Sequence, residues 1–185
     1  NENLPRSTTM TLTGGKIWGE VSESFLSTLK NNLSAGGKTY RPVSLWINWP
    51  VTDNSKQHLI LGGGEKFLHP NVDPSLLSGI MLNPMQQSEP SKIALFSGAQ
   101  YSWKQWKSEE EAKKLNDIAF NFVENGHFED SKVSAAFREL GKHMINQNMD
   151  NRVVKLEESV DLAPKLTDFM TKLKAGQDVT TERAA

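Results

Sequence analysis

Apolar and polar residues alternate along several stretches of the N-terminal half of the chain, which is the pattern of half-buried β-strands. The runs 8–13 and 16–21 alternate in this way and are joined by Gly14-Gly15. Tight hairpin turns need residues that adopt positive φ, so a Gly-Gly pair between two alternating runs predicts an antiparallel hairpin. The same alternation predicts a strand over residues 43–49.

Two further apolar stretches in this half favour strands, whereas the proline-rich segment between them favours an irregular connection. Residues 58–61 form a short apolar run, and residues 93–97 (IALFS) are apolar on both faces, which is typical of a central strand. The segment 70–90 holds four of the eight prolines. Because proline donates no backbone hydrogen bond, this segment predicts a packed irregular connection.

Apolar residues recur at helical spacing in four other segments. The predicted helices cover about residues 22–33, 108–125, 131–146 and 161–174, with a short strand over 153–156. The sequence Ser108-Glu-Glu-Glu111 is a capping box, in which the serine accepts from the backbone of Glu111 and the glutamate reaches back. Gly126 ends that helix.

These elements predict an α+β fold with a mainly antiparallel sheet in the N-terminal half and the four helices packed behind it. At 185 residues the chain is long enough to bury a sizeable core as a single domain, 1–185. Within it we expect a sheet-rich part over 1–107, a helical part over 108–175 and a polar tail over 176–185.

Charge and composition narrow the class of protein. The net charge is −1, divided into about +3 over residues 1–107 and −4 over 108–185. The chain contains no cysteine, which excludes disulfides and thiolate metal sites. No apolar run approaches the roughly 18 residues of a membrane span, so we expect no membrane partner. The cytoplasm is the default location, and a virion is the alternative.

No local pattern indicates a catalytic or metal site. The run Gly62-Gly63-Gly64-Glu65-Lys66 lacks the spacing and the Ser/Thr of a phosphate-binding loop and is interpreted as a turn. The four histidines lack the spacing of zinc ligands, and no nucleophile elbow is present. We therefore predict no catalytic residue, no metal and no cofactor, and a protein that is not an enzyme.

Aromatic and basic residues gather in the N-terminal half, which contains all five tryptophans. In the segment 101–107 (YSWKQWK) three aromatics alternate with two lysines. Bases of single-stranded nucleic acid stack on aromatic rings while lysine or arginine neutralises phosphates. The candidate nucleic-acid-binding residues are Lys16, Trp18, Arg41, Trp46, Tyr101, Trp103, Lys104, Trp106 and Lys107.

Two functions follow from this interpretation. The first is a non-enzymatic protein that binds single-stranded nucleic acid through an aromatic and basic sheet surface. The second is a structural subunit of a homo-oligomeric assembly, such as a viral or phage particle or a secretion apparatus, in which the polar chain ends act as arms. For the tryptophans taken by themselves, core packing is the leading alternative, ahead of stacking on nucleic acid, and a protein–protein interface comes last.

Overall fold

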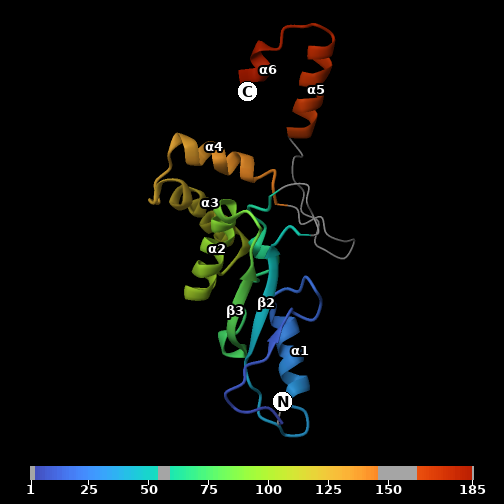
Figure 1. Cartoon of the computed structure of the whole chain (residues 1–185), viewed down its shortest axis with the longest axis vertical. Helices are drawn as coiled ribbons and strands as arrows, with labels where there is room; N and C mark the ends of the chain where they lie inside the picture. The colour runs from blue at the N-terminus through green and yellow to red at the C-terminus, as the bar shows by residue number, and fades with distance from the viewer. Residues whose placement is uncertain (1–2, 54–58, 146–161, 185) are drawn as a thin grey trace.

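The computed structural model describes residues 3–53, 59–145 and 162–184 (Figure 1). Three strands form its sheet: β1 (Thr11–Leu12), β2 (Val43–Pro50) and β3 (Leu77–Asn83). The helices are α1 (Glu23–Leu33), α2 (Ser88–Trp103), α3 (Glu109–Asn125), α4 (Lys132–Gly141), α5 (Leu162–Lys174) and α6 (Thr180–Ala184). Two short 3-10 helices, Gly64–Lys66 and Pro74–Leu76, lie between β2 and β3.

The sheet is parallel, so the prediction of a mainly antiparallel α+β fold is wrong. Its strand order is β1-β2-β3, and both neighbouring pairs run parallel. Parallel neighbours need a long crossover, which α1 provides between β1 and β2. A progressive order of three parallel strands occurs in a parallel barrel and also in one half of a doubly wound sheet.

The two faces of the sheet differ in burial. Val43, Leu45 and Ile47 are completely buried and belong to the same core cluster as Leu26 of α1 and Ile93 of α2. The opposite face carries Trp46 and its register partner Met81, which are 40% and 41% exposed. Within the described chain, the helices therefore cover one face of the sheet.

The predicted hairpin over 8–21 does not form. Gly14 and Gly15 do adopt positive φ, but they begin a tight loop that leads into α1. The chain folds back so closely that a Cβ on Gly19 would lie 2.0 Å from the carbonyl oxygen of Thr13. Val21 makes an isolated parallel bridge to Leu68 instead of pairing with β1. Gly-Gly marks a tight reversal, but it does not determine whether a strand follows.

Two other strand predictions are also wrong. Residues 93–97 lie inside α2, whose Ile93 and Ala94 face the core, while Phe96 packs at 5.0 Å on Phe122 of α3. An apolar run this short does not distinguish a strand from a helix packed on two sides. Leu59–Leu61 is not a strand, and His58 and residues 153–156 lie outside the described part of the chain. The region 70–90, predicted to be irregular, contains β3.

The helices over 108–125 and 131–141 follow the local sequence signals. Ser108 Oγ accepts from the Glu111 backbone at 3.2 Å, and Gly126 caps the end of α3 with φ +75°. The Glu111 carboxylate accepts from the Lys107 backbone rather than from that of Ser108. Helix α4 ends at Gly141, five residues before the predicted bound.

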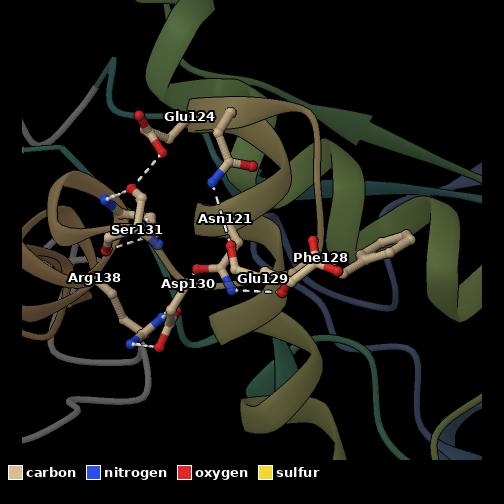
Figure 2. Close-up of polar contacts among 9 residues, drawn as sticks. Asn121, Glu124, Phe128, Glu129, Asp130, Ser131 and Arg138 are labelled. Carbon is tan, nitrogen blue, oxygen red and sulfur yellow. Dashed lines mark hydrogen bonds and ion pairs between the residues drawn. The ribbon is translucent and has the colours of Figure 1, made fainter.

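Polar contacts hold the connection between α3 and α4 (Figure 2). Arg138 of α4 forms two hydrogen bonds to Asp130, at 2.7 and 3.0 Å, and a third to Asn121 of α3 at 3.1 Å. Asn121 in turn donates to the Phe128 carbonyl at 2.9 Å. One arginine therefore joins both helices to the loop between them.

Helices α5 and α6 lie together at the end of the molecule opposite the N-terminus (Figure 1). Leu166, Met170 and Leu173 of α5 are each about half exposed. None of the described helices is both long and apolar enough to cross a membrane.

Candidate functional site

The carboxyl ends of β2 and β3 place two asparagines side by side. Asn48 lies near the end of β2, followed by Trp49-Pro50, and Asn83 is the last residue of β3, followed by Pro84. Their side chains are joined by a hydrogen bond of 3.0 Å from Asn83 Nδ2 to Asn48 Oδ1. In parallel α/β barrels the active site lies at this end of the strands.

Asn48 is the centre of a small hydrogen-bond network. Its Oδ1 also accepts from Trp46 Nε1 at 2.7 Å, and its Nδ2 donates to the carbonyl oxygen of Ile17 at 2.5 Å. Ile17 belongs to the loop that follows β1. The network therefore connects the carboxyl ends of all three strands.

The glycine run 62–64, which follows β2 in the sequence, packs against Trp49 at this end of the sheet. Trp49 is 1% exposed, donates through Nε1 to the Gly62 carbonyl at 3.0 Å and stacks on Phe67. A Cβ on Gly64 would lie 2.7 Å from the Trp49 ring. Gly64 is needed because the Trp49 ring packs directly on its backbone. The segment predicted to be a turn is a short 3-10 helix in which Gly64 and Glu65 are buried.

Side-chain and backbone contacts hold the loop after β1 in place. The Glu20 carboxylate lies 3.1 Å from Lys16 Nζ and 3.4 Å from His69 Nε2. The backbone of His69 donates to the Val21 carbonyl at 3.0 Å. These contacts fasten the loop that carries Ile17 to the segment before β3.

The candidate residues chosen from the sequence are dispersed. Trp46 takes part in the asparagine network, whereas Trp18 is half-buried in the loop after β1 together with exposed Lys16. Arg41 donates to backbone carbonyls of the N-terminal segment, including that of Pro5 at 2.9 Å. Lys16 and Arg41 therefore contact the chain's own loop after β1 and its N-terminal segment.

The segment 101–107 divides between core and surface. Tyr101 and Trp106 are each 2% exposed, lie 4.7 Å apart and donate to the carbonyls of His69 and Leu68. Burial raises the pKa of the Tyr101 phenol well above its usual value. Trp103 is 93% exposed, and Lys104 and Lys107 are exposed.

Trp103 borders a hollow of about 310 Å³ that also includes residues 77–80 of β3. This hollow lies toward the N-terminal end of the strand, away from Asn83 at the other end. It is therefore separate from the asparagine network. Among the described residues, no group of three or more His, Asp or Glu side chains is placed to hold a metal ion.

Asn48 and Asn83 are not among the candidate residues predicted from the sequence. Each is a polar residue at the end of an apolar segment, and each comes one or two positions before a proline that ends the strand. That signal gains meaning only when the two strands are parallel, because parallel neighbours bring their carboxyl ends together.

A progressive parallel sheet with polar side chains at its carboxyl ends is typical of barrel-type α/β enzymes. A family model described as beta-N-acetylglucosaminidase matches residues 1–142. The chain belongs to this beta-N-acetylglucosaminidase family.

Solved structures agree with the family match. The chain is similar to CpGH84D, with a TM-score of 0.67 and 27% identity over 97% of this chain and 27% of that one. It also shares its fold with a mutant of the O-GlcNAc hydrolase of Thermobaculum terrenum, with a TM-score of 0.57 and 20% identity over 94% of this chain and 34% of that one. The chain thus spans about a quarter to a third of the length of these proteins.

The family membership corrects the functional predictions. The prediction of a non-enzymatic protein that binds single-stranded nucleic acid is wrong, and so is the prediction of a structural subunit of a viral or phage particle or a secretion apparatus. The prediction that the protein is not an enzyme is wrong as well, because the family is one of glycosidases. No local motif revealed this function, because barrel sites draw single residues from different strands and not from one stretch of sequence.

Proposed function

We propose that the protein carrying this chain hydrolyses β-linked N-acetylglucosamine and that this chain provides part of the sugar-binding surface. The observation that supports this most directly is the contact between Asn48 and Asn83 at the carboxyl ends of adjacent parallel strands, in a chain of this family. Side-chain amides offer both donors and acceptors, which suits the hydroxyl groups of a sugar.

The exposed sheet face is the second support. In a closed parallel barrel one face of the sheet is covered by helices and the other faces the barrel interior. Here the β2 residues on the helix-covered face are fully buried, while Trp46 and Met81 on the other face remain exposed. Trp46 therefore lies on the interior side of such a barrel, beside Asn48, where its ring is available to an apolar part of the sugar.

The distribution of acidic residues indicates how many of the catalytic carboxyl groups these strand ends can supply. Glycoside hydrolysis uses two carboxyl groups that flank the scissile bond. Among the four residues that follow each of the three strands, Asp53 is the single acid. We infer that this part of the chain holds the sugar, and that at least one catalytic carboxylate comes from outside these strand ends.

The test is release of 4-nitrophenol from 4-nitrophenyl N-acetyl-β-D-glucosaminide by the purified protein that carries this chain. We expect hydrolysis of this substrate and not of the corresponding β-glucoside. Replacing Asn83→Ala should lower kcat/KM by about tenfold or more, because one hydrogen bond to the substrate is lost. Replacing Trp103→Ala, which lies away from the site, should leave it unchanged. An Asn83→Ala enzyme with unaltered kcat/KM would contradict the assignment.

A further inference from the structure

A second cleft is lined by residues of α3, of α4 and of the glycine run 62–64, and neither Asn48 nor Asn83 belongs to its lining. Its volume is about 370 Å³, which lies within the range of pockets that hold small molecules. Glu65 lines this cleft and is only 8% exposed. The structure gives the Glu65 carboxylate no hydrogen bond and no ion pair with any described residue.

A buried carboxylate without a partner needs an explanation. Charged groups inside proteins are normally paired, because leaving water is unfavourable unless hydrogen bonds or an opposite charge replace it. Glu65 is held in the short 3-10 helix Gly64–Lys66, whose Gly64 packs on the Trp49 ring. The adjacent Lys66 pairs with Glu109 at 2.6 Å and not with Glu65. The carboxylate therefore faces the cleft without a positive partner from its own segment.

Two of the basic residues in the lining already have acidic partners. Arg138 lies 2.7 Å from the carboxylate of Asp130, and Lys142 lies 2.6 Å from that of Glu139. Each of these acids neutralises the cation that it contacts. Neither basic group is therefore left to compensate a further carboxylate in the cleft.

The remaining charged residues of the lining are Lys113, Asp117 and Glu65. Lys113 and Asp117 are exposed and opposite in charge, so together they add no net charge. The buried Glu65 is left as the uncompensated group. Phe120 and Leu61, which are 2% and 1% exposed, supply apolar surface to the same cleft. A ligand that fits this lining has a positive group that donates hydrogen bonds and a short apolar part.

An ammonium group meets these requirements better than a metal ion does. It carries three N–H donors, and an ionised carboxylate only accepts. Calcium takes about six to eight oxygen ligands, whereas no cluster of three or more acidic or histidine side chains in the described ranges is placed to hold a metal. We propose that this cleft binds a small aliphatic amine, whose ammonium donates to the Glu65 carboxylate while its carbon chain packs on Phe120 and Leu61. This second site does not rest on the proposed glycosidase function.

The test is an NMR titration of the 15N-labelled 185-residue chain with n-butylammonium chloride. We expect saturable shifts of the backbone amides of Gly62, Gly63 and Glu65, with a Kd of about 1–10 mM for so small a probe. Tetramethylammonium chloride carries the charge but no N–H donor, and sodium butyrate carries the opposite charge. Neither should give saturable shifts at these amides. No response to n-butylammonium, or an equal response to either control salt, would overturn the proposal.

A matched pair of variants tests the role of Glu65. Glu65→Gln keeps the shape of the side chain and removes its charge, so it should weaken n-butylammonium binding by about tenfold or more. Glu129→Gln removes the same charge from an exposed residue outside the lining and should leave the Kd unchanged. Backbone amide spectra show whether each variant keeps its fold. Wild-type affinity in a folded Glu65→Gln variant would contradict the assignment.

Lys113→Glu gives a second measurement that does not require changing a buried residue. Lys113 is exposed, so the fold should tolerate the substitution. Replacing a positive by a negative charge in the lining should strengthen n-butylammonium binding by about twofold to fivefold at low ionic strength, and less in about 0.5 M salt. Unchanged or weaker binding would show that the cleft does not select a positive charge, which would overturn the proposal.

Discussion

Single residues in the segment 101–107 show how similar side chains take opposite roles. Trp106 is buried against Tyr101 and donates to the Leu68 carbonyl at 2.8 Å, whereas Trp103, three positions earlier, is 93% exposed at the end of α2. Each is followed directly by a lysine, and the local sequence does not distinguish them. Their energetic contributions should therefore differ strongly.

We expect Trp106→Ala to lower the free energy of unfolding by about 3–5 kcal/mol, because it leaves a cavity and an unpaired carbonyl. Trp103→Ala should change it by less than about 0.5 kcal/mol. Urea unfolding followed by circular dichroism measures both. Equal effects of the two substitutions would contradict the burial described for this segment.

At the scale of elements, the predicted helices and the strand predicted over 43–49 are present, whereas α2 and β3 were not predicted from the sequence. Capping by Ser108 and Gly126 acts between residues a few positions apart, so periodicity and caps located α3 correctly. In β3, the residues Ser78-Gly79 are weak strand formers, and pairing with β2 decides the conformation. A strand of this kind has no local signature.

The link between α3 and α4 gives a pH prediction. The Arg138 guanidinium beside Asp130 holds the pKa of that carboxyl below its usual value. A carboxyl whose pKa is lower in the folded state stabilises the fold above its ordinary pKa, and this contribution disappears as the pH falls through the folded-state pKa. We therefore expect Arg138→Gln to lower the Tm at pH 7, and the difference from the wild type to shrink as the pH falls below about 3.9.

Thermal unfolding by circular dichroism between pH 7 and pH 2 measures this difference. Lys132→Gln is the control on the same helix: Lys132 is exposed, and the structure shows no ion pair for it within the described chain. The control should show no such pH-dependent difference. A Tm difference for Arg138→Gln that stays constant across this range would show that the ion pair with Asp130 does not contribute.

At the scale of the whole molecule, the sheet has one covered and one uncovered face. Parallel sheets are almost always covered on both faces, yet Trp46 and Met81 are about 40% exposed. An exposed apolar face of this kind marks a surface that another part of a protein or a ligand covers. This agrees with similar proteins that are three to four times as long as the chain.

Tryptophan fluorescence tests whether that face is open in the 185-residue chain. Iodide should quench Trp103 and Trp46, but not Trp49 and Trp106, which are 1% and 2% exposed. Comparing wild type with Trp103→Phe and with the Trp103→Phe/Trp46→Phe double variant separates the components. If Trp46→Phe removes no quenchable emission, the face is covered in solution.

The sequence by itself determined the helical segments of the second half, because caps and helical periodicity operate over three to four residues. It did not determine the direction of the strands or the position of the site. Asn48 and Asn83 are 35 residues apart and meet only because β2 and β3 run parallel in one register. That pairing depends on the burial of one sheet face under α1 and α2, a property of the assembled core. The tertiary structure therefore decided both the fold class and the residues that form the sugar site proposed above.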